Sequence, residues 1–131
     1  LIPEAANYVM TSVKGMVGYL APECHTLGKA SERCDVYSFG ILLLELVSGK
    51  RPIEREANGV KKSIVDWATP LLADAKVEEI VDPRLEGRYD EEGMMRIVHV
   101  ATTCVQKDPE KRPTMLEVVT LLKGINKDHY T

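Results

Sequence analysis

The chain has 131 residues, of which 44% are hydrophobic and 28% are charged, a composition typical of one globular domain or part of one. The net charge of -3, with lysines and arginines scattered along the chain, argues against the basic surface that nucleic-acid binding normally needs. No stretch has the character of a signal peptide or a membrane span. We therefore expect neither a nucleic-acid partner nor a transmembrane segment.

The cysteines form an odd set of three without C-x-x-C spacing: Cys24, Cys34 and Cys104. This pattern predicts reduced, partly buried thiols in a reducing compartment. The three histidines share no metal-ligand spacing with the cysteines, so no metal site is expected.

The first 30 residues contain several glycines and prolines and no sustained apolar period, which predicts an extended or looped segment. The hydroxyls of Thr11 and Ser12 fall in what should be an exposed part of this loop. The chain begins at Leu1 without a methionine, and no strand pattern stands out in its first residues. We expect it to be a piece of a longer protein.

The most apolar stretch runs from Asp35 to Gly49 and predicts a buried central helix over residues 32–48. Asp35 lies near its start, where a carboxylate meets free N–H groups and the positive end of the helix dipole. Gly49, followed by Pro52, is a typical stop signal. The expected apolar stripe of this helix consists of Val36, Phe39, Leu43, Leu46 and Val47. Because the helix is too short to cross a bilayer, we expect other parts of the protein to cover it.

Residues 49–62 are polar and are expected to form a surface connection. Ser63 is a good N-cap for a second helix over about residues 63–73. A short helical turn is expected at 77–81, where Asp82-Pro83 stops it.

Two further helices complete the pattern. Acidic residues precede the first, over about 91–106, and apolar residues recur along it at helical spacing. Thr114 and Glu117 form a capping box for the last helix, over 114–123, and Gly124 is expected to end it. With no convincing strand, the sequence predicts an all-α chain.

Three strings in this order carry a family resemblance: Gly18-Tyr19-Leu20-Ala21-Pro22-Glu23, Asp35-Val36-Tyr37-Ser38-Phe39-Gly40 and Lys111-Arg112-Pro113-Thr114. Around one buried helix they resemble the C-terminal part of the eukaryotic protein kinase domain, whose signature set includes A-P-E. The similarity is greatest to plant receptor-like kinases, in the Pto-interacting-kinase-like cytoplasmic group. It extends from Leu1 to about Gly124.

The resemblance implies the helical C-lobe portion of the α+β protein kinase fold, all-α in this fragment. Residues 1–30 then correspond to the activation segment, the substrate-positioning loop and the A-P-E region. Residues 31–124 correspond to the rest of the helical C-lobe, and residues 125–131 form a tail. The fragment starts just after the metal-binding Asp-Phe-Gly site of the family.

The resemblance also assigns roles within the first 30 residues. Thr11 and Ser12 match the stretch where such kinases are phosphorylated, although unmodified loop hydroxyls are an equal alternative. A phosphate there adds nearly two negative charges that a basic cluster can bind, which orders the loop. The substrate-positioning loop, of Ser/Thr-kinase form, consists of Gly15, Met16, Val17, Gly18 and Tyr19.

Three further residues match structural positions of the family. Glu23 and Arg112 match a buried carboxylate–guanidinium pair that ties the activation segment to the helical lobe. Asp35 matches the aspartate that holds the backbone of the catalytic loop, which this chain lacks. Two positions depart from the family: Met16 replaces a threonine whose hydroxyl bonds the catalytic base and a lysine, and Met10 replaces a hydroxyl residue.

Phosphoryl transfer needs a glycine-rich loop, a nucleotide-binding lysine, metal-binding Asp and Asn residues and a catalytic Asp. The chain contains no G-x-G-x-x-G, His-Arg-Asp or Asp-Phe-Gly string, so it has no catalytic or metal-binding residue of this kind. We expect this fragment to bind no ATP; ATP and Mg2+ are implied for the complete kinase.

Two functions remain open. The chain is the C-terminal part of a Ser/Thr protein kinase, or it is a pseudokinase or truncated interaction module that acts through the helices after Ser63. Expected partners are the kinase N-lobe and catalytic loop in cis, a protein substrate and an upstream kinase or receptor. The expected location is cytoplasmic, with any membrane association made through parts outside this chain. Without the upstream parts, the central helix should expose an apolar patch.

Overall fold

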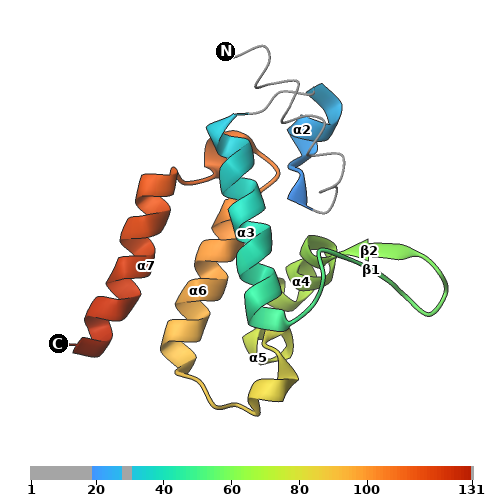
Figure 1. Ribbon diagram of the computed structural model, residues 1–131. Helices are drawn as coiled ribbons and strands as arrows, with labels where there is room; N and C mark the ends of the chain where they lie inside the picture. Colours follow the sequence, from blue (N-terminus) through green and yellow to red (C-terminus); the bar gives the residue numbers. More distant parts are fainter. Residues whose placement is uncertain (1–18, 28–30, 131) are drawn as a thin grey trace.

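The computed structural model describes residues 19–27 and 31–130. Its helices pack around one long helix, α3 (Glu32–Ser48), as Figure 1 shows. The other helices are α2 (Pro22–Leu27), α4 (Ile64–Ala73), α5 (Val77–Ile80), α6 (Glu91–Cys104) and α7 (Met115–Tyr130). Short 3-10 turns occur at Pro83–Leu85 and Pro109–Lys111, and the strands β1 (Ile53–Arg55) and β2 (Lys61–Ser63) form a hairpin. The expected helical fold is confirmed.

Local signals define both ends of α3. The Ser31 side chain at the N-cap accepts a hydrogen bond from the backbone N–H of Cys34. At the other end Gly49 adopts a left-handed conformation with φ 73°, and its N–H donates to the carbonyl of Glu45 at 2.8 Å. These caps place the helix over the residues that the sequence predicts.

The most extensive helix contact joins α3 to α6, which lie side by side in Figure 1. The two backbones approach closely at Gly40, where an added Cβ atom would lie 2.7 Å from side-chain atoms of both Cys104 and Val105. Only glycine allows this approach. This close contact at Gly40 therefore determines which face of α3 is buried against α6.

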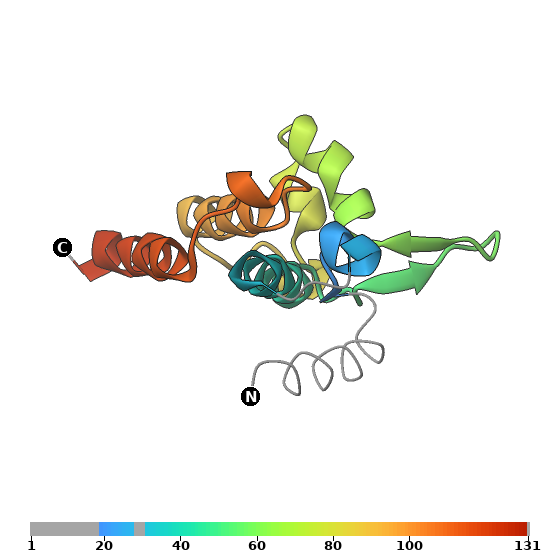
Figure 2. The ribbon, with the colours of Figure 1, turned by 90° about the horizontal axis from the view of Figure 1, so that it is seen from above.

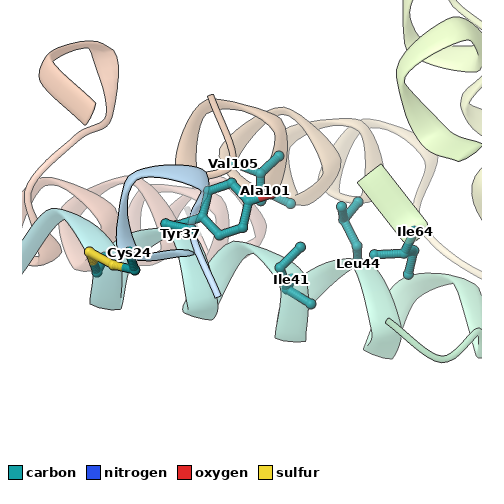
Figure 3. Packing of buried hydrophobic residues seen from close by; sticks show 9 residues of the cluster. Cys24, Tyr37, Ile41, Leu44, Ile64, Ala101 and Val105 are labelled. Carbon is teal, nitrogen blue, oxygen red and sulfur yellow. A yellow bond between two sulfur atoms is a disulfide. The ribbon is translucent and has the colours of Figure 1, made fainter. Parts of the chain in front are cut away.

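The core follows the buried face of α3. Figure 3 shows Tyr37, Ile41 and Leu44 along this helix, with Ala101 of α6 and Ile64 of α4 among the buried residues around them. A second cluster lies between the end of α3, α4, α5 and α6, and a third between α3, α6 and α7. All three clusters include residues of α3, so this helix organises the described part of the chain.

The expected apolar stripe of α3 is wrong in part. Val36 and Val47 are buried, but Leu46 is 72% exposed, and Leu42 is exposed beside it. The buried side instead includes Tyr37, Ile41 and Leu44. Because the helix is apolar nearly all round, its sequence defines no unique face, and the close contact with α6 makes the selection.

The polar connection after α3 contains two strands that were not expected. β1 pairs antiparallel with β2, with Ile53 opposite Ser63. The turn is closed by Asn58, whose side-chain oxygen accepts from the N–H of Val60, and by the Glu56 N–H, which donates to the Val60 carbonyl. Each strand has only three residues, none of them buried. The backbone hydrogen bonds of the hairpin therefore form without the alternating apolar pattern by which strands are recognised in a sequence.

The last helix is longer than expected. Thr114 caps its start as expected, because the Glu117 N–H donates to the Thr114 side chain at 3.1 Å. The second bond differs from a capping box: the Thr114 hydroxyl donates to the Glu117 carboxylate at 3.2 Å, so the two side chains bind each other. However, α7 continues through Gly124 to Tyr130. A glycine inside a helix costs only about 1 kcal/mol, and no proline follows it to end the helix.

Figure 2 places the hairpin and α7 at opposite sides of the helical body. Within residues 19–27 and 31–130, no helix combines the length and the apolar content that crossing a bilayer requires.

Candidate functional site

The most densely bonded polar group of the described core is the guanidinium of Arg112, in the loop between α6 and α7. Its side chain is completely buried. Nε donates to the carbonyl of Gln106 at 2.7 Å, and the terminal nitrogens donate to the carbonyls of Arg33 and Lys107. With two bonds to Glu23, all five N–H donors of the guanidinium are used.

Glu23 lies in the first turn of α2 and binds Arg112 through both carboxylate oxygens. The distances are 2.6 Å from Nη1 to Oε2 and 2.9 Å from Nη2 to Oε1. This hydrogen-bonded pairing holds the pKa of the Glu23 carboxyl below its ordinary value. Two parallel bonds to a planar guanidinium cannot be reproduced by a lysine.

Aromatic and backbone contacts complete this anchor, which we define as the Glu23–Arg112 pair and the groups bound to it. The guanidinium carbon lies 4.9 Å from the centre of the Tyr37 ring, and burial raises the pKa of Tyr37. The Arg33 side chain in turn donates to the backbone carbonyl of Arg112. The anchor thus joins α2, the first turn of α3 and the loop after α6.

A second contact fixes the residues before α2 on α3. The hydroxyl of Ser38 donates to the carbonyl of Tyr19 at 2.7 Å. A hydrogen bond with the Glu45 carboxylate, one turn from the end of α3, raises the pKa of the Tyr19 hydroxyl. The segment from Tyr19 to Glu23 is therefore held along the length of α3.

The expectation that all cysteines are reduced is wrong for two of them. Cys24 of α2 and Cys34 of α3 form a disulfide, seen beside the core in Figure 3. The sequence gives no sign of this bond, because the odd count and the absence of C-x-x-C spacing indicate no pairing. Cys104 is a free, buried thiol, and burial raises its pKa to about 11.

One group of potential metal ligands lies within the described residues. The ligand atoms of Glu23, Cys24 and Cys34 lie within 4.8 Å of one another. Both Glu23 oxygens are bound to Arg112, however, and the two sulfurs are bonded to each other. In this structure the ligand atoms of the group are therefore already used by an ion pair and a disulfide.

Asp35 lies on the exposed side of the first turn of α3. Together with Thr114 and Met115 it lines a hollow of about 350 Å³ between α3 and the start of α7. Helical geometry places Asp35, Leu42 and Leu46 on one side of α3, opposite the buried face. We call these three exposed residues the open face of α3. The role of Asp35 as a catalytic-loop anchor stays a prediction.

The remaining predicted site residues lie outside the described residues. These are the phosphosite candidates Thr11 and Ser12 and the loop residues Gly15, Met16, Val17 and Gly18. Of the predicted site residues, the structure thus brings together Glu23 and Arg112. Tyr19 is bound through its carbonyl to Ser38 of α3, and Asp35 lies in the first turn of α3.

The chain belongs to the protein kinase family: the family model described as "protein tyrosine and serine/threonine kinase" matches residues 2–122. The matched region contains the A-P-E string whose glutamate binds Arg112. The relatives within the family include plant receptor-like kinases and PTI1-like kinases, as the sequence resemblance predicts.

Individual relatives support this placement. The chain is 48% identical over 118 residues to a PTI1-like tyrosine-protein kinase of Arabidopsis thaliana, with 90% of this chain and 33% of that protein covered. It is 46% identical over 121 residues to the receptor-like serine/threonine-protein kinase NCRK of Arabidopsis thaliana, with 90% and 21% covered. The chain therefore spans about a fifth to a third of the length of these relatives.

A solved structure agrees with the fold. The pseudokinase domain of BIR2, an immune regulator of the RLK/Pelle family, matches with a TM-score of 0.75 and 32% sequence identity. The match covers 87% of this chain and 34% of that one.

The Glu23–Arg112 pair predicts a specific pH dependence. The pairing holds the folded-state pKa of Glu23 below the ordinary value of 4.5. Its contribution to the free energy of unfolding is therefore fully present above pH 4.5 and is lost as the pH falls through the folded-state value. Urea denaturation at a series of acidic pH values should show this loss. Glu23→Gln should weaken the dependence of the free energy of unfolding on pH below pH 4.5. Equal slopes of this free energy against pH in the wild-type and variant proteins would contradict the prediction.

Proposed function

We propose that the chain is the C-terminal part of a Ser/Thr protein kinase domain and that it does not transfer phosphate by itself. In the complete protein this part would carry the activation segment and the platform for a protein substrate. The observation that carries the proposal is the anchor: the A-P-E glutamate Glu23 is bound bidentately by the fully buried Arg112. Such a pair fixes the end of an activation segment on the helical lobe.

The nucleotide chemistry belongs to parts outside the chain. In the complete kinase, ATP and Mg2+ would be held by the glycine-rich loop, lysine and Asp-Phe-Gly aspartate that this sequence does not contain. The open face of α3 supports this assignment, because it leaves Asp35 exposed together with Leu42 and Leu46, two and three helical turns further along the same side. An upstream kinase or receptor and a cytoplasmic location are part of the same proposal.

A second function is a pseudokinase or truncated interaction module. Two observations favour it: Met16 stands where the family has a threonine, and one solved structure that shares the fold is a pseudokinase domain. Methionine cannot donate the hydrogen bond that a threonine hydroxyl makes to the catalytic base.

A chimaera separates the two functions. The upstream part of a kinase domain from a plant relative is joined to this chain, ending just before the position aligned with Leu1. The 131-residue chain alone, given ATP, Mg2+ and a generic protein substrate, should transfer no phosphate, and robust turnover would refute the proposal. The chimaera should phosphorylate the substrate.

The variant Met16→Thr in the chimaera tests the alternative. The added hydroxyl should raise the rate about tenfold, the equivalent of one hydrogen bond of about 1.4 kcal/mol. If the chimaera is folded but inactive with either residue at position 16, the interaction module is the better description.

A further inference from the structure

Two cysteines lie directly beside the anchor and have no part in the proposed kinase function. Cys24 follows Glu23 in α2, and Cys34 lies in the first turn of α3, next to Arg33. Both are buried, and their disulfide joins the two helices over a sequence separation of 10 residues. The bond therefore links the same two elements that Arg112 holds together.

The surroundings suit the reduced pair as well as the disulfide. The Cα atoms lie 6.8 Å apart, at the upper end of the range that a disulfide spans. Cys34 Sγ lies 3.5 Å from Oε2 of Glu23, and the Ser31 hydroxyl lies 3.6 Å from the same sulfur. A reduced Cys34 thiol thus has an acceptor in Glu23.

Oxidation changes this contact without removing the ion pair. A disulfide sulfur has no hydrogen to donate, so Glu23 loses the thiol as a donor. Its two oxygens keep their bonds to Arg112 at 2.6 and 2.9 Å. Both redox states are therefore compatible with an intact anchor, and they differ in whether a covalent bond reinforces it.

We propose that Cys24 and Cys34 form a reversible oxidation site, whose oxidant is a peroxide and whose disulfide locks α2 onto α3 beside the anchor. Hydrogen peroxide oxidises one thiol to a sulfenic acid and leaves as water. The second thiol attacks the sulfenic sulfur, and a second water leaves as the S–S bond forms. Two thiols and one peroxide give one disulfide and two waters, and a dithiol reductant returns the thiols.

The third cysteine provides an internal comparison. Cys104 lies in α6, packed among Val36, Val100 and Val118 in a different core cluster. It is free and fully buried. The other two cysteines lie in a different cluster and are paired with each other, so Cys104 has no resolving partner and should be recovered as a free thiol after the same treatment.

Mapping the oxidised thiols tests the site directly and does not depend on kinase activity. The 131-residue chain is reduced, treated with hydrogen peroxide, alkylated and digested with trypsin without reductant. Cleavage after Lys14, Lys29, Arg33 and Lys50 places Cys24 in peptide 15–29 and Cys34 in peptide 34–50. These two peptides should be recovered joined, two hydrogens lighter than the sum of the free peptides. When the folded, oxidised protein is treated with dithiothreitol before alkylation and digestion, the two peptides should be recovered separately.

Four outcomes would overturn the proposal. Both cysteines could still be alkylated after peroxide treatment, which would show that no disulfide forms. They could instead pair with cysteines of other chains. The bond could resist dithiothreitol until urea unfolds the protein, which would make it a permanent structural link. Zinc could protect both thiols of the reduced protein from alkylation, which would indicate a metal site instead.

The effect of the disulfide on the stability of the anchor is measured by comparing the oxidised and reduced forms of the wild-type chain, and variants serve only as controls. The oxidised chain should melt roughly 5–15 °C higher than the reduced chain, because the bond restricts the unfolded state. Backbone amides of residues 22–27 should exchange at least about tenfold more slowly when oxidised. A Cys104→Ala control should show both differences, and Cys24→Ala should show neither; equal exchange in the two states would overturn the proposed lock.

Discussion

Replacing Arg112 with lysine is expected to lower the free energy of unfolding of the chain by about 2–4 kcal/mol. Lysine keeps the positive charge but cannot reach the acceptors of the guanidinium: two carboxylate oxygens and the carbonyls of Gln106, Arg33 and Lys107. Buried acceptors without a donor each cost about 1 kcal/mol or more. The Glu23 side chain is 20% exposed, so partial hydration keeps the loss from being larger. Urea denaturation followed by circular dichroism measures the effect.

Arg84→Lys is the control, because Arg84 also binds a carboxylate through two nitrogens. Its Nε lies 3.1 Å from Oδ1 of Asp82 and its Nη2 lies 2.7 Å from Oδ2, whereas Arg112 uses its two terminal nitrogens. The Arg84 side chain is 80% exposed and the Asp82 side chain 14% exposed, so water surrounds the guanidinium and can hydrate the lysine ammonium that replaces it. Its substitution should leave the free energy of unfolding unchanged within the error of the measurement. Similar losses at both sites would mean that burial of Arg112 does not determine the strength of the anchor.

The helices could be predicted because their signals are local. Ser31 and Gly49 cap α3 with contacts three or four residues away, and Ser63 caps α4 in the same way. The buried face of α3 could not be predicted, because it depends on the contact of Gly40 with α6, more than 60 residues later. Hydrophobic periodicity cannot choose a face on a helix that is apolar nearly all round.

The anchor illustrates a different limit. Glu23 and Arg112 are 89 residues apart, and no spacing rule connects them. Their pairing was predicted only from the family resemblance, and the structure places them in contact. The family resemblance does not predict the disulfide, and three cysteines without C-x-x-C spacing match no known disulfide pattern. The hairpin was missed since its three-residue strands are stabilised by backbone bonds and by Asn58 rather than by a buried face.

The open face of α3 gives a prediction with opposite outcomes in two contexts. Leu46 is 72% exposed in this chain, so Leu46→Gln should change its free energy of unfolding by less than about 0.5 kcal/mol. In the chimaera, the upstream kinase segments should cover the open face. The same substitution should then cost about 2–4 kcal/mol, through lost burial of an apolar side chain and a buried amide without partners.

The control for this comparison is Leu116→Gln. Leu116 is 78% exposed near the start of α7, does not line the hollow at Asp35, and should stay exposed in the chimaera. Its substitution should leave the stability of both proteins unchanged, and the difference between the two leucines isolates burial of the open face. If Leu46→Gln is also neutral in the chimaera, the upstream segments do not bind α3 there, and the role of Asp35 as an anchor of the catalytic loop fails with it. If Leu46→Gln already destabilises the 131-residue chain, this chain covers its own central helix and needs no upstream segment to bury it.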